Sequence, residues 1–216
     1  MKVISTNLGK PVFFEWNGEK QATGIYKYPV DGPLLLKEED VAGDTVSDRR
    51  VHGGIFKACY LFSSDFYPYW KEKYPDLKWN WGMIGENLTV AALDESELMI
   101  GNIYRLGTAL VQIPEPREPC YKLGIRFGTQ DILKQFIDHG HPGTYIRILK
   151  TGQVQIGDEL QLVEQAKRSL STKQLYEQLF ARKKNPNLLQ LAVENEALPI
   201  RKREKLKKLL ERGKAP

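Results

Sequence analysis

Cys120 stands in a run of residues that would present and activate a thiol. The run, Pro-Glu-Pro-Arg-Glu-Pro-Cys-Tyr-Lys-Leu, covers residues 114–123 and places Arg117 and Lys122 on either side of the cysteine. The thiolate is the form of cysteine that attacks substrates and binds metals, and nearby cations favour that anion. Because prolines restrict the backbone around them, we expect a rigid loop that presents Cys120 as a metal ligand or a nucleophile. A small buried apolar residue is the alternative.

Cations also gather in a second motif, closer to the N-terminus. Residues 47–54 read Ser-Asp-Arg-Arg-Val-His-Gly-Gly and are followed by Lys57. Arg49, His52 and Lys57 are suited to bind a phosphate or another oxyanion, and the two glycines allow a close approach of the backbone. The motif therefore predicts an anion pocket, with ordinary surface residues before a turn as the alternative.

A third motif, Gly-Met-Ile-Gly-Glu-Asn-Leu-Thr-Val over residues 82–90, leads from a loop into an expected strand. Asn87 and Thr89 are two residues apart, so their side chains would share one side of that strand. Both carry hydrogen-bonding groups suited to a polar heterocycle. Alternatively, they satisfy backbone groups of the turn.

Other kinds of site have little support in the sequence. His139 and His141 lack the Cys and His spacing of a zinc site. The sequence contains no Walker, Rossmann or paired-carboxylate pattern. Cys59 lies in an apolar stretch, and we expect it to fill the core.

The composition is that of a globular protein with one main domain and a small appendage. The chain has 216 residues, of which 41% are hydrophobic, and this is enough for a sizeable core. It has neither an apolar run of about 20 residues nor an N-terminal export signal. We therefore expect a cytoplasmic protein with reduced cysteines and no membrane partner.

Charge is divided unevenly along the chain. Residues 165–216 contain 14 Lys and Arg and 5 Asp and Glu, a net charge of +9, whereas residues 1–164 carry −4. The basic segment raises nucleic acid or an acidic partner as possibilities. A solvated face of a small helical module explains the same charge, and we favour this interpretation over nucleic-acid binding.

Short strands separated by turns dominate the first three quarters of the chain. A hairpin is expected where Asn17-Gly18 separates residues 12–16 from 19–23, because both turn residues tolerate a positive φ. Further strands are expected at 57–62, 87–91, 102–106, 109–113, 144–149 and 159–163, with helices at 63–74 and 129–139. Such a pattern predicts a mainly β fold, a barrel or a sandwich, with a few helices.

After residue 164 the pattern becomes helical. Residues 171–174 have the form of a capping box, and apolar residues recur at helical spacing through residue 180, over 187–194 and after Pro199. We therefore expect a main domain at 1–164 and a C-terminal three-helix domain at 165–216.

In this order the motifs resemble those of MOSC domains, the modules related to the C-terminal part of molybdenum-cofactor sulfurases. The resemblance rests on residues 48–54 with Lys57, then 85–89, 100–102 and 117–123, and it covers roughly residues 1–164. The basic helical tail is similar to that of bacterial hydroxylaminopurine-resistance proteins, the YiiM type.

The resemblance implies a mainly β (α+β), barrel-like domain with peripheral helices that holds the molybdenum cofactor, molybdopterin. Cys120 would be the molybdenum ligand and the catalytic residue. Tyr145 and Arg147 would close the site. The implied cofactor-binding residues are Arg49, His52, Lys57, Asn87, Thr89, Arg117 and Lys122.

The function implied is a molybdenum-dependent reduction of N-hydroxylated compounds, such as 6-N-hydroxylaminopurine, to the amine, which detoxifies a base analogue. Since the chain has no flavin or nicotinamide motif, electrons would come from a separate reductase, with the helical tail as its docking surface. Two alternatives stay open. Cys120 could carry persulfide sulfur to a cofactor, or the basic helices could serve as a nucleic-acid adaptor.

Overall fold

A curled eight-stranded sheet forms the centre of the computed structural model, which describes residues 1–45 and 53–212. Its strand order is β12-β8-β9-β10-β6-β7-β1-β4. The strands are β1 (Lys2–Gly9), β2 (Val12–Trp16), β3 (Glu19–Thr23), β4 (Lys27–Pro29), β5 (Leu34–Leu36), β6 (Cys59–Ser63), β7 (Leu88–Ala91), β8 (Ile103–Leu106), β9 (Ala109–Gln112), β10 (Thr144–Lys150), β11 (Gly152–Val154) and β12 (Leu160–Glu164). Two small sheets, β2-β3 and β5-β11, accompany the large one.

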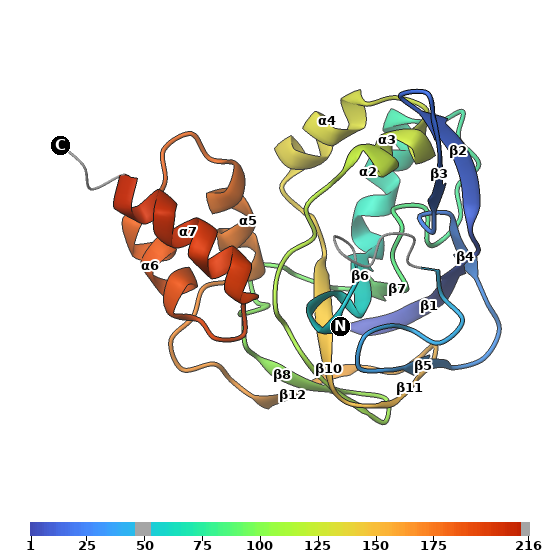
Figure 1. The fold of residues 1–216 in the computed structure, drawn as a ribbon. Helices are drawn as coiled ribbons and strands as arrows, with labels where there is room; N and C mark the ends of the chain where they lie inside the picture. Colours follow the sequence, from blue (N-terminus) through green and yellow to red (C-terminus); the bar gives the residue numbers. More distant parts are fainter. Residues whose placement is uncertain (46–52, 213–216) are drawn as a thin grey trace.

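Helices lie above the sheet and beside it (Figure 1). They are α2 (Tyr67–Lys73), α3 (Tyr121–Phe127), α4 (Asp131–His139), α5 (Thr172–Phe180), α6 (Pro186–Glu194) and α7 (Ile200–Arg212), with short 3-10 turns at Ile55–Lys57 and Ser64–Phe66. The helices α2, α3 and α4 lie at one end of the sheet, and α5, α6 and α7 form a separate group at its side. The mixed α+β, barrel-like architecture expected from the sequence is confirmed.

The sheet curls until β1 meets the segment just before β12. The Val3 amide donates to the Asp158 carbonyl at 2.8 Å, and the Gly157 amide donates to the Val3 carbonyl at 2.8 Å. The Leu160 amide donates in turn to Met1. These bonds join β1 to the start of β12, which explains the barrel-like shape of the curled sheet.

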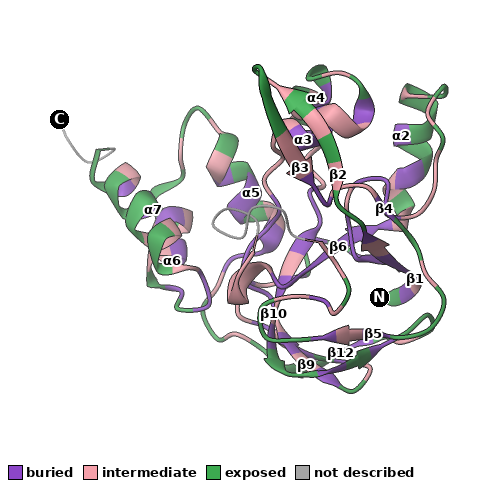
Figure 2. Cartoon of the chain, turned by 45° about the vertical axis from the view of Figure 1, so that its right-hand side comes forward, coloured by how far each residue is buried: buried purple, intermediate pink, exposed green. Residues whose placement is uncertain are grey.

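Two apolar clusters stabilise this arrangement. One fills the curled sheet and continues into the C-terminal helices, so that it includes both Val3 and Leu206, each almost fully buried. The other is rich in aromatic rings, among them Trp70 and Phe136, and lies under α2, α3 and α4. Figure 2 shows the buried residues concentrated in the central strands, with exposed residues along the outer helices. Since one cluster spans the junction at residue 164, the division into two domains stays a prediction.

Local signals in the sequence placed several elements correctly. The hairpin of β2 and β3 pairs Trp16 with Glu19, and both Asn17 and Gly18 have a positive φ. Helix α5 begins with the expected capping box at Ser171, and α4 ends at Gly140 in the left-handed conformation. The strand expected at 57–62 begins only at Cys59.

No helix within residues 1–45 and 53–212 is both long and apolar enough to cross a membrane.

Candidate functional site

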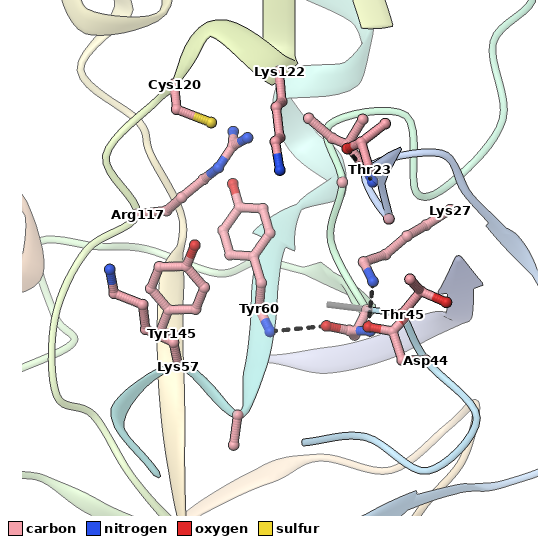
Figure 3. A pocket seen from close by; sticks show the side chains of 15 residues that line it. Thr23, Lys27, Asp44, Thr45, Lys57, Tyr60, Arg117, Cys120, Lys122 and Tyr145 are labelled. Atoms are coloured by element: carbon pink, nitrogen blue, oxygen red, sulfur yellow. Dashed lines mark hydrogen bonds and ion pairs between the residues drawn. The ribbon is translucent and has the colours of Figure 1, made fainter. Parts of the chain in front are cut away.

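A pocket opens where the segment before α3 faces the strands β3, β4 and β6 (Figure 3). Its volume is about 650 Å³, open mouth included. The lining residues are Thr23, Gly24, Ile25, Lys27, Asp44, Thr45, Lys57, Ala58, Tyr60, Gly85, Asn87, Arg117, Cys120, Lys122 and Tyr145. The first and third sequence motifs therefore meet in one pocket, together with Lys57 from the end of the second.

Cys120 lies at the edge of this pocket, directly before α3. Its backbone is extended, with φ −131° and ψ 167°, and its carbonyl accepts the Leu123 amide at 2.8 Å. The thiol is free and half-buried. The preceding loop is attached to β10, since Pro116 forms a bridge with Thr144. The expected presentation of Cys120 by a fixed loop is thus what the geometry provides.

Arg117 is held inside the pocket by aromatic rings. Its guanidinium carbon lies 5.1 Å from the ring centroid of Tyr60 and 5.4 Å from that of Phe136. Such cation–π contacts hold the group without using its hydrogen-bond donors. Its Nη1 atom is buried and has no hydrogen-bond partner within the described chain. A buried donor without a partner is costly, so this atom is suited to bind an anionic ligand.

Two lysines complete a cationic rim around Cys120. Figure 3 shows the Lys122 ammonium and the Arg117 guanidinium pointing into the same space as the sulfur atom. Lys122 is buried, and its Nζ donates to the Ala22 carbonyl at 3.3 Å. Lys57 lies on the opposite wall, with its Nζ 5.6 Å from the Tyr145 ring centroid. The three cations together favour a ligand that carries several negative charges.

The far end of the pocket contains an ion pair that the sequence motifs did not reveal. Lys27 pairs with Asp44, and both side chains are almost fully buried. Asp44 also accepts the Asn87 amide nitrogen at 2.9 Å and the Gly9 backbone amide at 2.8 Å. Asn87 Oδ1 in turn accepts the Tyr60 amide at 3.2 Å. This end therefore offers a mixed array of donors and acceptors, suited to a polar heterocycle.

Two tyrosines provide neutral polar groups between these ends. Burial raises the pKa of Tyr60 well above its usual value, although Arg117 partly opposes this effect. Burial likewise raises the pKa of Tyr145. Both phenols therefore keep their protons at neutral pH. The Tyr60 hydroxyl donates to the Pro142 carbonyl at 2.7 Å.

A close approach of two backbone segments shapes one wall. A Cβ atom added to Gly24 would lie 1.9 Å from the Thr45 carbonyl oxygen. Only glycine leaves enough room for this contact. Gly24 thereby allows the segment after β3 to come against residues 44 and 45, which carry the far end of the pocket.

The remaining predicted site residues have other positions. Arg49 and His52 lie outside the described residues. Thr89 does not line the pocket: it is fully buried, accepts the Asn7 side-chain amide at 3.1 Å and donates to Glu86 at 2.7 Å. Because Asn7 in turn accepts a hydrogen bond from Asn87, Thr89 supports the pocket from below.

Three further side chains that the sequence analysis discussed lie away from the pocket lining. Arg147 packs on the Phe56 ring, 5.2 Å from its centroid. Cys59 is almost fully buried, and burial raises its pKa, in agreement with its expected place in the core. His141 pairs with Glu95 at 3.1 Å. The described part of the chain contains no cluster of three or more His, Cys, Asp or Glu side chains that would hold a metal.

The pocket as a whole fits an anionic cofactor with one soft metal. Cys120 would supply a single sulfur ligand of the kind that soft metals prefer. Arg117, Lys122 and Lys57 would supply the charges that a phosphate group requires, and the buried Arg117 Nη1, which has no hydrogen-bond partner within the described residues, is suited to bind it. The array around Asp44 supplies the contacts for a heterocycle.

The comparisons with known proteins agree with this geometry. The model of the MOSC domain matches residues 48–161. Protein YflK of Bacillus subtilis is 38% identical over 169 residues, covering 78% of this chain and 76% of that protein. Protein YiiM of Escherichia coli is 35% identical over 147 residues, covering 67% and 66% of the two chains. A protein named Reductase from Gibberella moniliformis is 35% identical over 176 residues, which span 80% of this chain but 31% of that longer protein.

Solved structures show the same architecture. The crystal structure of YiiM from Geobacillus stearothermophilus superposes with a TM-score of 0.80 at 31% identity, over 97% of this chain and 98% of the other. YiiM from Escherichia coli superposes with a TM-score of 0.75 at 23% identity, over 100% and 96% of the two chains, and this likeness concerns the fold alone. The chain therefore belongs to the MOSC domain family, which is generally associated with binding of the molybdenum cofactor.

Proposed function

We propose that this protein is a molybdenum cofactor-dependent oxidoreductase that reduces N-hydroxylated compounds, such as 6-N-hydroxylaminopurine, to their amines. The observation that carries the proposal is the pairing of a presented thiol, Cys120, with the buried and unpartnered Arg117 Nη1 in one pocket. A thiol alone would suit many reactions. A thiol beside an unsatisfied buried cation suits a metal held in an anionic cofactor.

The side chains of the pocket would divide the cofactor between them. Cys120 Sγ would bind molybdenum, and Arg117, Lys122 and Lys57 would bind the phosphate of molybdopterin. The array of Asp44 and Asn87 would accept and donate hydrogen bonds to the pterin. Arg49 and His52 belong to the family motif and would add further contacts.

The reaction consumes two electrons and two protons. It converts R–NH–OH to R–NH2 and releases the hydroxyl oxygen as water. The molybdenum cofactor, when bound, supplies the redox chemistry, and the protein supplies the binding site. The Tyr145 phenol stays protonated and is suited to donate a hydrogen bond to the substrate, whereas the Tyr60 hydroxyl already donates to the Pro142 carbonyl. The Arg117 guanidinium stabilises negative charge that builds up beside them.

The relatives support an oxidoreductase without identifying its substrate. One relative is named Reductase, and the part that this chain matches makes up about a third of it. In the present protein we propose that a separate reductase delivers the electrons. The basic helices α5 to α7 lie beside the segment that carries Cys120, and they offer this partner a positively charged surface (Figure 1).

A reduction assay tests the proposal. The protein is produced in a host that makes the cofactor and is supplied with reduced benzyl viologen, so that no partner reductase is needed. We expect 6-N-hydroxylaminopurine to yield adenine with wild-type protein and none with Cys120→Ala. Protein that contains molybdenum and pterin but forms no amine from several N-hydroxylated compounds would disprove the proposed reaction. A mass increase of one sulfur atom on Cys120 would favour persulfide transfer instead.

A further inference from the structure

The C-terminal helices are tied to the cysteine-bearing loop by one buried lysine. Lys202 lies in the first turn of α7 and forms ion pairs with both Glu115 and Glu118. These two carboxylates flank Arg117 in the sequence and precede Cys120 by five and two residues. The Lys202 side chain is 13% exposed and that of Glu115 is 1% exposed, so the contact is an internal one.

The loop is attached on two sides, through the backbone of Glu115 and through the side chain of Glu118. The Glu115 carbonyl accepts the Tyr145 amide at 3.0 Å, which joins the loop to β10. The Glu118 carboxylate accepts the Lys202 ammonium at 2.8 Å. The loop is therefore held by the sheet at one end and by α7 at the other. Arg117 lies between these two attachments.

Glu115 also pairs with a cation that lines the pocket. Lys57, a pocket cation, lies 3.9 Å from Glu115, whereas Lys202 makes the closer pair with that carboxylate. Burial opposes the charge of Lys202, but Glu115 and Glu118 outweigh this effect and raise its pKa. Lys202 thus remains a cation and neutralises Glu115.

We propose that Lys202 is a positioning residue: by binding Glu115 and Glu118 it fixes the loop that carries Arg117 and Cys120. The C-terminal helices are then a structural part of the site. The geometry of the loop can be tested without any cofactor, and only the consequence for turnover depends on the proposed function.

Hydrogen–deuterium exchange of the cofactor-free protein measures this positioning directly. In Lys202→Met we expect the amides of Leu123 and Tyr145, which donate to the loop carbonyls of Cys120 and Glu115, to exchange about tenfold faster than in the wild type, because the buried Glu115 carboxylate loses its main partner. Lys202→Arg keeps the positive charge that binds the carboxylates of Glu115 and Glu118. Exchange in this variant should stay within about twofold of the wild type.

A second variant separates positioning from general loss of stability. Leu210 is buried on the same helix but contacts the apolar cluster rather than the loop, so Leu210→Ala destabilises α7 and leaves the ion pairs in place. We expect faster exchange in α6 and α7 of this variant and wild-type exchange of the Leu123 and Tyr145 amides. If Lys202→Met does not fold, Glu118→Gln removes one of the two negative charges that bind Lys202 and should give a smaller change in the same direction.

Two results would overturn the proposal. One is wild-type exchange of the Leu123 and Tyr145 amides in Lys202→Met, or in Glu118→Gln where that variant replaces it. The other is an equal acceleration in Leu210→Ala, since the loop would then respond to stability alone. Neither result would affect the proposed reaction, because no cofactor or substrate is present in the experiment.

Discussion

The Arg117 guanidinium lies over the ring of Tyr60, with 5.1 Å between its central carbon and the ring centroid. This contact places a permanent cation in a buried position without using its hydrogen-bond donors. One of these donors, Nη1, is left without a partner within the described residues. In the proposed site this donor would bind the anionic part of the cofactor.

Replacement of Arg117 should therefore affect binding and stability in opposite directions. In Arg117→Met we expect the affinity for molybdopterin to fall by about 10- to 100-fold, because a charge-assisted hydrogen bond is lost. The free energy of unfolding of the cofactor-free protein should stay equal or rise by up to about 2 kcal/mol, because an apolar side chain of similar volume replaces a buried charge. Pterin fluorescence after release and urea denaturation measure the two quantities. A large loss of stability with normal pterin content would show that the guanidinium has a purely structural role.

The ion pair of Lys27 and Asp44 should contribute far more to stability than a surface pair. Lys27→Met leaves a buried carboxylate without its cation, and we expect a loss of about 3–5 kcal/mol in the free energy of unfolding. Lys134→Met is the matched control, because Lys134 pairs with Asp138 on an exposed face and its side chain is 82% exposed. This variant should change stability by about 0.5 kcal/mol or less. Equal losses in urea denaturation would contradict the distinction.

His139 should make stability depend on pH in acid. Burial, followed by the positive charges of His141, Lys173 and Lys73, lowers the pKa of His139 to about 4. An unfolded histidine titrates near pH 6.5, so the unfolded state binds more protons between these values, and stability falls as the pH falls from 6.5 to 4.

The variant His139→Phe keeps a ring among Phe66, Tyr69 and Trp70 but cannot take up a proton. Since His139 is only half-buried, solvent screening reduces the effect to about 1–2 kcal/mol. We expect the variant to gain this amount over the wild type between pH 7 and pH 4 in denaturation experiments. Parallel curves for the two proteins would show that His139 does not charge in this range.

The parts of the fold that could be predicted from the sequence are those with local signals. Asn17-Gly18 predicted its hairpin, and the capping box at Ser171 predicted the start of α5, because both depend on residues a few positions apart. Helix α3 was not predicted, since the prolines before Cys120 indicated a loop that continued past it. The parallel pairing of β6 with β7 follows from packing between distant segments, and no local pattern indicates it.

In the candidate site, too, the residues found from the sequence are those with a local signal. Cys120, Arg117 and Lys122 lie in one short run, so their spacing could be read directly, and all three line the pocket. Lys27 and Asp44 were missed because they are 17 residues apart and lie outside the motifs. Thr89 and Asn87 are two residues apart, so the sequence predicted that their side chains lie on the same side of one strand. In the structure Asn87 precedes β7 and its side chain lines the pocket, whereas the Thr89 side chain faces the interior. Such differences depend on where a strand begins, which is the least certain part of a prediction from sequence.

The central claim is that Cys120 Sγ holds molybdenum in this pocket, and metal analysis tests it most directly. Wild type, Cys120→Ala and the core variant Cys59→Ala are produced in a host that makes the cofactor, and molybdenum per folded chain is measured by mass spectrometry. We expect close to one molybdenum atom per chain for the wild type and for Cys59→Ala, and almost none for Cys120→Ala with an unchanged circular dichroism spectrum. A Cys120→Ala protein that retains molybdenum at the wild-type level would contradict the account.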